Sequence, residues 1–129
     1  MTIEKKTYRS GPYQDFFAEG TQIGNILYLS GQVGTDDEGN TPTSITDQTK
    51  VAYRNMQAIL SQFGADMSNI VDETFFATDM NEFFDNIEDV YGAREAAYGG
   101  KPEVCQTVLQ VVALVQPELK IEIKCIAHL

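Results

Sequence analysis

The sequence predicts an α+β fold in which a mixed β-sheet carries two helices on one face. Two segments show the 3.6-residue apolar period of amphipathic helices, and several shorter segments are rich in β-branched and aromatic residues. They follow one another in the order ββ-α-β-α-ββ, which packs both helices against one sheet. At 129 residues the chain has the size of one domain, so we expect a single domain over residues 1–129.

The first two elements are strands, which we expect over residues 14–20 and 24–33 with a connection between Gly20 and Gly24. Residues 34–42 are rich in Asp, Gly, Asn, Thr and Pro, a composition typical of a loop.

The first helix follows this loop, and Ser44 or Thr46 is expected to cap it with a side-chain oxygen. Its apolar residues recur with the spacing of one helical face: Ala52, Met56, Ile59, Leu60 and Phe63. Gly64 is the expected stop, because glycine tolerates the left-handed conformation at a helix C-terminus.

A short strand is expected over residues 70–77, and a second helix follows it. Asp79 and Glu82 resemble a capping pair at the start of this helix. The residues on its expected inner face are Phe84, Ile87, Tyr91, Arg94 and Tyr98. The run Gly99-Gly100-Lys101-Pro102 ends the helix.

Two strands close the chain. Residues 107–115 are almost continuously apolar, which predicts a strand buried on both faces. Residues 119–127 alternate between apolar and polar, which predicts a strand with one buried face. The sheet face without helices is left bare, and such a face in a small domain is usually covered by self-association.

The composition excludes several classes of function. A net charge of −10, from 9 basic and 19 acidic residues, argues against binding to nucleic acid and to anionic membranes. No apolar run reaches the roughly 18 residues of a membrane span, and residues 1–6 lack the apolar core of a signal peptide. We therefore expect a cytoplasmic protein.

Cys105 and Cys125 lack the spacing of a metal site, so we interpret them as free thiols. A catalytic role for Cys105 stays open. His128 is the one histidine, and its penultimate position argues against a Ser-His-Asp triad and against a histidine-based metal site. We expect no metal.

Glu122 is the first candidate for chemistry. It lies between Lys120 and Lys124 on one face of the last strand. This face is either solvated, with no function, or it points into a cleft between subunits. In the second case Glu122 holds a water molecule or moves a proton.

Ser30 and Gly31, at the end of an apolar strand, allow two interpretations. Gly31 permits a bulge, or its missing side chain lets a ligand reach the backbone. Tyr13, Phe16 and Phe17 are more typical of a core or an interface than of a ligand site.

A series of short matches, in register from about residue 11 to the end, resembles the RidA/YjgF (Rid) family. They are Gly24-Asn25, Leu29-Ser30-Gly31-Gln32, Gln48, Asn55-Met56, Ile59-Leu60, Gly64-Ala65, Ile70-Val71, Phe76-Ala77-Thr78-Asp79-Met80, Ile121-Glu122-Ile123 and Ile126-Ala127.

The resemblance implies a chorismate-mutase-like fold and a homotrimer with clefts between its subunits. It also implies hydrolysis of small reactive enamines or imines, such as 2-aminoacrylate, without a metal or organic cofactor. By this resemblance Glu122 positions the attacking water, and Ser30 and Gly31 form the floor of the cleft. Tyr13 lines the cleft, or Phe16 or Phe17 takes its place.

The sequence departs from the family where a substrate-binding arginine is expected. Gln106 stands there, and a shift of the alignment brings Cys105 or Val104 to the position. None of these is a cation, and the placement of Lys101, after two glycines, is not predictable. The loss of a charge-assisted pair implies a substrate other than 2-aminoacrylate, with Gln106 contacting a neutral group.

Three functions remain open at this point. The first is hydrolytic deamination of a small enamine or imine, with Glu122 as the acid/base. The second is a related hydrolysis with Cys105 as the nucleophile. The third is a trimeric small-molecule-binding or chaperone-like protein without catalysis. Ribonuclease activity is reported for the family, but an acidic chain is poorly suited to binding RNA.

Overall fold

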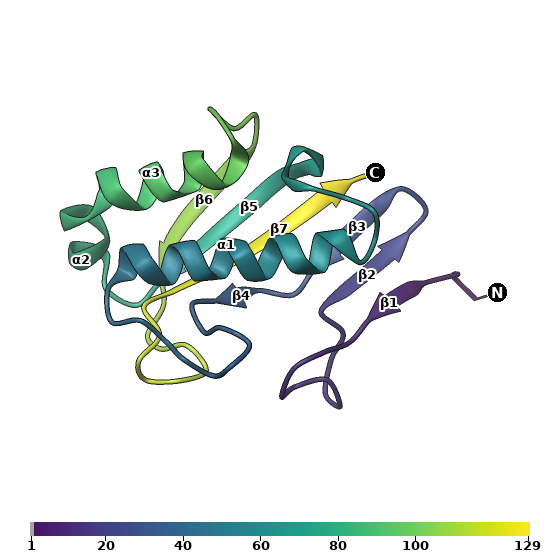
Figure 1. Cartoon of the computed structure of the whole chain (residues 1–129), viewed down its shortest axis with the longest axis horizontal. Coiled ribbons are helices and arrows are strands. Elements are labelled where there is room, and N and C mark those ends of the chain that lie inside the picture. Colours follow the sequence, from purple (N-terminus) through teal and green to yellow (C-terminus); the bar gives the residue numbers. More distant parts are fainter. Residues whose placement is uncertain (1) are drawn as a thin grey trace.

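In a computed structural model, which describes residues 2–129, the strands form one seven-stranded sheet (Figure 1). The strands are β1 (Lys6–Tyr8), β2 (Gly20–Ile23), β3 (Ile26–Leu29), β4 (Gln32–Val33), β5 (Ile70–Ala77), β6 (Cys105–Gln110) and β7 (Ile121–His128). They are ordered β1-β2-β3-β7-β5-β6, and β4 also pairs with β7. The β5–β6 pair is parallel and the other pairs are antiparallel, so the sheet is mixed, as predicted.

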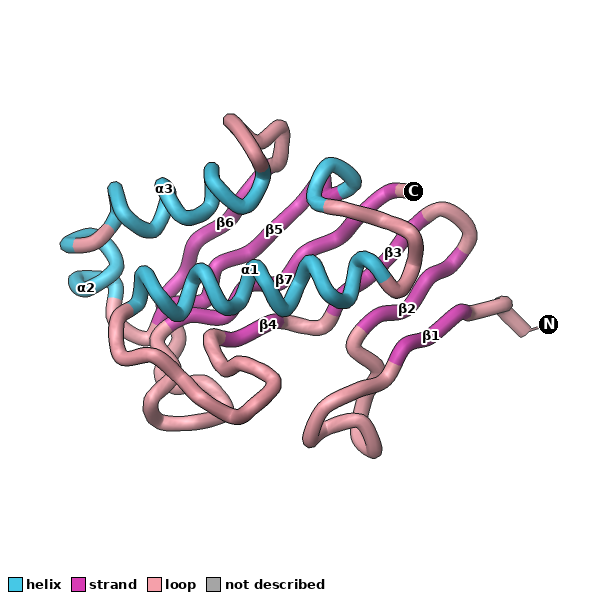
Figure 2. The backbone as a smooth tube through the Cα atoms, viewed as in Figure 1, coloured by secondary structure: helices cyan, strands magenta, loops and turns pink. Residues whose placement is uncertain are grey.

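The helices lie on one face of this sheet. They are α1 (Ile45–Ser61), α2 (Met80–Asp85) and α3 (Ile87–Tyr98), with a short 3₁₀ turn, η1 (Met67–Asn69). Figure 2 shows α1 and α3 running over the same side of the strands. We call this side the helix face and the other side the open face. The predicted α+β sandwich, with helices on one face of a mixed sheet, is confirmed.

The core fills the space between the helix face and the helices. Alternation along β7 buries Ile121, Ile123 and Cys125 against the helices and turns the residues between them to the open face. The strand and helix residues of this core include Leu27, Leu29, Met56, Leu60, Phe75, Phe83 and Val90. Within residues 2–129, no helix covers the open face (Figure 2).

The predicted start of the first helix is confirmed. The Ser44 hydroxyl accepts a hydrogen bond from the Asp47 amide at 3.0 Å, as expected of an N-cap. Gly64 adopts a positive φ of 70° just after the helix, in agreement with its predicted role as a stop.

The N-terminal prediction is wrong in part. Residues 14–20 do not form a strand, because the chain turns between Gly11 and Phe16, where the Phe16 amide donates to the Tyr13 carbonyl at 2.9 Å. The first strand of the predicted pair begins only at Gly20. Strand β1, which the pattern did not predict, pairs with β2 at the edge of the sheet.

The second predicted helix is divided into α2 and α3 at Asn86, whose φ of −117° and ψ of 16° are not helical. The Asp79 carboxylate caps α2 by accepting from the amides of Asn81 and Glu82, so this start is confirmed. Gly99, with φ of 76°, ends α3 as predicted.

The strand expected over residues 107–115 also differs. Strand β6 begins at Cys105, ends at Gln110 and lies at the edge of the sheet. Val112, beyond its end, is fully exposed, so this apolar run is not buried on both faces of a single chain. Within residues 2–129, no helix has the length and apolarity to cross a bilayer.

Candidate functional site

The junction between β3 and β4 is a β-bulge opposite β7. Tyr28 pairs with Ile126 and Gln32 pairs with Ile123, so four steps on one strand face three steps on the other. One extra residue is therefore accommodated between them, at Ser30 and Gly31. The structural interpretation of these two residues, that the strand bends here, is confirmed.

The same bulge brings the backbone of Gly31 against the side chain of Glu122. A Cβ atom at Gly31 would lie 2.7 Å from Cδ and 2.9 Å from Cγ of Glu122, closer than carbon atoms pack. A side chain at this position would force the Glu122 side chain to shift, so glycine permits the close approach of the carboxylate. The bulge that bends the strand is therefore also the surface against which the Glu122 side chain lies.

Ser30 is held by the segment that precedes β2. Its hydroxyl donates to the Ala18 carbonyl at 2.7 Å, and its amide donates to the Glu19 carbonyl at 2.9 Å. The Gln32 amide group donates to the Glu19 carboxylate at 2.8 Å and to the Ser30 carbonyl at 3.1 Å. These bonds fix the conformation of the bulge, and the Ser30 hydroxyl proton is already donated to the Ala18 carbonyl.

Glu122 lies on the open face, half-buried, between Val33 of β4 and Phe76 of β5. Within residues 2–129, no ion pair or hydrogen bond to its carboxylate accompanies this burial. Burial raises the pKa of Glu122, and the charge of Lys124 offsets part of this rise. A carboxylate that is partly desolvated and has no partner is suited to accept and return a proton near neutral pH.

Gln106 does not lie with Glu122. In the parallel ladder Gln106 pairs with Glu73, and both side chains point to the helix face. There the Gln106 amide donates to the Glu73 carboxylate at 2.7 Å and accepts from the Tyr91 hydroxyl. The structure therefore separates Gln106 from the site to which the sequence had assigned it, because the sheet lies between them.

Glu73 forms the centre of a buried polar network that sequence reasoning missed. Its side chain is only 1% exposed, and the Arg94 Nε atom donates to it at 2.5 Å. The hydroxyl of Tyr53 donates at 3.0 Å and that of Tyr98 at 2.7 Å. Burial, and then the charge of Glu73, raise the pKa of both tyrosines, so they remain protonated donors. We call these residues, with Gln106, the Glu73 cluster.

Cys105 lies on the open face but away from Glu122. It pairs with Asp72 near the start of β5, whereas Glu122 pairs with Phe76 near its end. The Cys105 thiol donates to the Asp72 carboxylate at 3.2 Å, and this bond, with desolvation, raises the pKa of the thiol. A raised pKa disfavours the thiolate, so this environment does not activate Cys105 as a nucleophile.

The three aromatic candidates lie in the turn that precedes β2. The rings of Tyr13 and Phe17 stack with centroids 5.8 Å apart, and Phe16 is 79% exposed. The bonds of Ser30 to Ala18 and Glu19 tie the end of this turn to the bulge. Within the described residues, the Tyr13 hydroxyl accepts a hydrogen bond from the Gln116 amide at 3.5 Å and forms none with Glu122.

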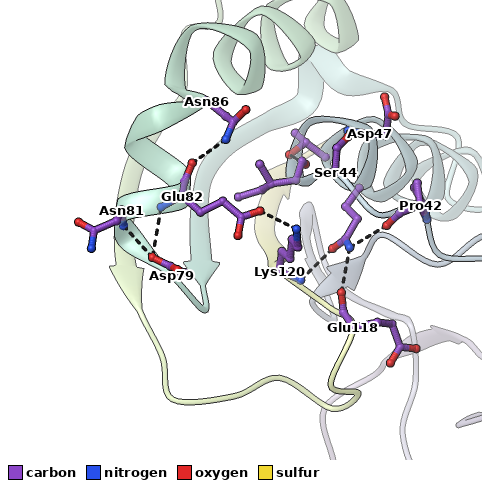
Figure 3. Close-up of polar contacts among 12 residues, drawn as sticks. Pro42, Ser44, Asp47, Asp79, Asn81, Glu82, Asn86, Glu118 and Lys120 are labelled. Carbon is purple, nitrogen blue, oxygen red and sulfur yellow. Dashed lines mark hydrogen bonds and ion pairs between the residues drawn. The ribbon is translucent and has the colours of Figure 1, made fainter.

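A cavity of about 390 Å³ lies elsewhere, where the loops at residues 41–43, 78–82 and 117–120 meet. As Figure 3 shows, Lys120 pairs with Glu82 across it, at 2.7 Å, and the Asp79 carboxylate caps α2 beside it. Glu122 does not line this cavity.

Comparisons with known proteins agree with this fold. The family model described as Endoribonuclease L-PSP matches residues 8–129. The chain is 33% identical over its whole length to a chloroplastic Reactive Intermediate Deaminase A of Arabidopsis thaliana, and spans 65% of that protein. It is 31% identical to a mouse 2-iminobutanoate/2-iminopropanoate deaminase, over 91% of this chain and 81% of the mouse protein.

Solved structures of other proteins also resemble this chain in fold. Escherichia coli TdcF with bound serine has a TM-score of 0.77 and 27% identity, over 99% of this chain and 98% of that one. A YjgF/YER057c/UK114 family member from Mycobacterium tuberculosis has a TM-score of 0.82 and 23% identity, over 98% and 100% of the two chains. The second similarity is evidence for the fold alone.

Proposed function

Because the chain belongs to the RidA/YjgF family, which the Endoribonuclease L-PSP model describes, we propose that it hydrolyses a small reactive imine or enamine to a carbonyl compound and ammonia. The observation that carries the proposal is Glu122, a half-buried carboxylate on the open face that has no hydrogen-bond or ion-pair partner within residues 2–129. The printed names of the Arabidopsis and mouse relatives, a reactive intermediate deaminase and an imine deaminase, support the same reaction class.

Glu122 acts as the acid/base in this reaction. Water attacks the imine carbon while the carboxylate accepts one of its protons, and the electron pair of the C=N bond moves to nitrogen. Glu122 then returns the proton to nitrogen, which gives a carbinolamine. The carboxylate next accepts the hydroxyl proton of the carbinolamine and passes it to the amino group, so that the carbonyl group forms as the C–N bond breaks and ammonia leaves. Its raised pKa favours both steps, because a group with a pKa nearer to neutrality accepts and donates with similar ease.

A second and a third copy of the chain complete the site. The open face carries large apolar side chains that are more than a third exposed, among them Tyr28 and Leu109. A homotrimer that covers this face turns the surface around Glu122 into a cleft and excludes water from it. Phe16 and Phe17, which are exposed in the turn before β2, and the partly buried Tyr13 are then available to line such a cleft.

The substrate-binding role assigned to Gln106 is not kept. Its amide is committed to Glu73 on the helix face, so the argument for a neutral substrate no longer rests on it. Cys105 is likewise not retained as a nucleophile, because its thiol is bonded to Asp72 and its pKa is raised. Ser30 and Gly31 remain as the floor on which Glu122 lies.

Nucleic acid is a poor substrate for the same face, in spite of the family model's name. With a net charge of −10, the chain repels a phosphate backbone, and the strands described contribute only two lysines, Lys6 and Lys124.

The test uses imines generated in situ, both acyclic and cyclic, with ammonia release followed against a buffer blank. We expect acceleration by the purified chain and a loss of about 100-fold in kcat for Glu122→Gln, the lower end of what acid–base catalysis supplies. The matched control is Glu95→Gln, on the exposed side of α3, with light scattering to verify an unchanged assembly. Equal turnover by Glu122→Gln would contradict the proposal, and silence across the panel would favour the non-catalytic, small-molecule-binding alternative.

A further inference from the structure

Lys124 shares the open face of β7 with Glu122. One residue separates the two in sequence, so their side chains leave the sheet on the same side, with Cα atoms roughly 7 Å apart. Lys124 is exposed, whereas Glu122 is half-buried. A positive charge at this separation lowers the free energy of an ionised carboxylate.

The bulge determines where the Lys124 ammonium lies. The ladder between β7 and the segment that runs from β3 to β4 is interrupted at the bulge, and Leu29 lies at the start of this interruption. The Lys124 Nζ atom donates to the Leu29 carbonyl at 3.0 Å. Gly31, farther along the same bulge, lies against the Glu122 side chain. A single backbone feature therefore holds the ammonium and receives the carboxylate.

Few other charged or titratable groups occur on the elements packed around Glu122. Its cross-strand neighbours, Val33 and Phe76, are uncharged. Lys120, two positions before it, pairs with Glu82 at 2.7 Å. The remaining titratable groups on these elements are Glu19, Tyr28, Asp72 and His128.

The two carboxylates in this set already accept hydrogen bonds. Glu19 accepts from the Gln32 amide at 2.8 Å. Asp72 accepts from the Cys105 thiol at 3.2 Å. Lys124 forms no ion pair within residues 2–129, so its charge is not matched by another carboxylate of the described chain.

Catalysis by Glu122 makes two demands on its surroundings. The carboxylate has to be partly desolvated, and it has to be ionised when water attacks the imine. Burial opposes the second demand, because it favours the neutral acid. Other copies of the chain that cover the open face, as proposed above, remove still more water from Glu122 and increase this conflict.

We infer that Lys124 is a positioning residue that keeps Glu122 ionised in the covered site and thereby sets the pH range in which the chain is active. The inference about activity rests on the proposed function. Burial raises the pKa of Glu122, and the ammonium limits this rise. The bond to Leu29 matters because an exposed lysine that moves freely in water contributes little to a nearby carboxylate.

The first experiment titrates Glu122 directly and does not depend on turnover. The carboxyl carbon NMR signal of Glu122, assigned by its absence in Glu122→Gln, is followed against pH in the full chain. We expect Lys124→Met to raise the pKa of Glu122 by about one pH unit, because the neighbouring charge is lost. Lys124→Arg keeps a charged donor and should bring the pKa back close to that of the natural chain. Lys101→Met, at an exposed lysine after α3, is the matched control and should leave it unchanged.

The second experiment measures kcat/KM against pH with an imine that the natural chain hydrolyses. The acidic limb of this profile reports the ionisation of the essential base in the free enzyme. We expect Lys124→Met to move this limb to higher pH by the same amount as the NMR titration, and Lys124→Arg to return it.

Each outcome decides one of the two proposals. An unchanged or lower pKa of Glu122 in Lys124→Met would overturn the inference, and the lower value would mean that the carboxylate had moved into water. A rise that Lys124→Arg does not reverse would also overturn it, because the effect would then come from packing. A shifted NMR titration with an unshifted acidic limb would leave the deaminase proposal standing and overturn the role of Lys124 in setting the pH range. A shifted titration in a chain without turnover would support the charge effect on Glu122 and contradict the proposed function.

Discussion

Two carboxylates on neighbouring strands of this sheet have opposite surroundings. Glu73, on the helix face, accepts hydrogen bonds from four side chains, those of Tyr53, Arg94, Tyr98 and Gln106. Glu122, on the open face, is half-buried and forms none within the described residues. A buried charge is tolerated when its hydrogen-bonding capacity is used, as it is for Glu73.

Because their hydrogen bonding differs, the two carboxylates contribute differently to the protein. The donors around Glu73 are supplied by α1, α3 and β6, so its charge ties these elements to the sheet. The unused capacity of Glu122 contributes no such link and is open to a ligand or a water molecule. Glu73 thus contributes to stability, and Glu122 is the carboxylate for which we propose a chemical role.

The largest effect that tests this comparison is expected from Arg94→Met. It leaves the Glu73 charge buried without its cation, and removal of one partner of a buried pair costs about 3–5 kcal/mol. Urea unfolding of the purified variant measures this loss. Arg54→Met, at an exposed position of α1, is the matched control and should change the free energy of unfolding little.

The double variant Glu73→Gln/Arg94→Met sharpens the result. It removes both charges, so it should recover more than half of the stability lost in the single variant. A single variant within about 1 kcal/mol of the natural chain would mean that the Glu73 cluster does not hold the helices to the sheet.

An intermediate effect is expected from Gly31→Ala. The added Cβ atom meets the Glu122 side chain, and such overpacking costs about 1–3 kcal/mol unless the carboxylate moves. If the carboxylate moves, kcat falls while stability is kept, and if it stays, stability falls. Gly92→Ala in α3, where a Cβ atom meets nothing within 4 Å, should do neither. An alanine at residue 31 that affects neither property would show that this approach is not needed.

The smallest effect concerns pH. The pKa of Glu122 is higher in the folded chain than in the unfolded chain, so the folded state binds the proton more readily. Stability is then greatest below the unfolded pKa and declines as pH rises through the folded pKa. Glu122→Gln should remove this decline and stabilise the chain at pH 7 by roughly 0.5 kcal/mol. Thermal unfolding between pH 4 and 8 measures this decline in the natural chain and in the variant. A Glu122→Gln variant that is less stable than the natural chain at pH 7 would contradict the prediction.

The sequence predicted the elements whose patterns are local. Helix α1, strand β5 and strand β7 each carry a clear period and their own caps or flanking turns. The turn before β2 was missed because Phe16 and Phe17 look like strand residues, although backbone hydrogen bonds fold this segment back on itself. The break at Asn86 was missed because apolar spacing continues across it.

In the candidate site, the sequence predicted only what the alternation of side chains along one strand determines. Glu122 follows directly from the period of β7. Gln106 was misassigned because its face depends on how β6 pairs with β5, and a shift of one residue exchanges the two faces. Glu73 and Arg94 are 21 residues apart in sequence, and only the tertiary fold brings them together. The role of Gly31 against Glu122 requires the same long-range information.

The bulge at Ser30 and Gly31 also resets which residues of the strand are internal. Before it, Leu27 and Leu29 point to the helices, whereas after it Gln32 and Gly34 do so. Loss of a single residue here would leave three steps on each strand, so Gln32 would still pair with Ile123 and point to the helices, but the bulge that brings Gly31 against Glu122 would be gone. The extra residue therefore serves the close approach to Glu122 rather than the register of the sheet.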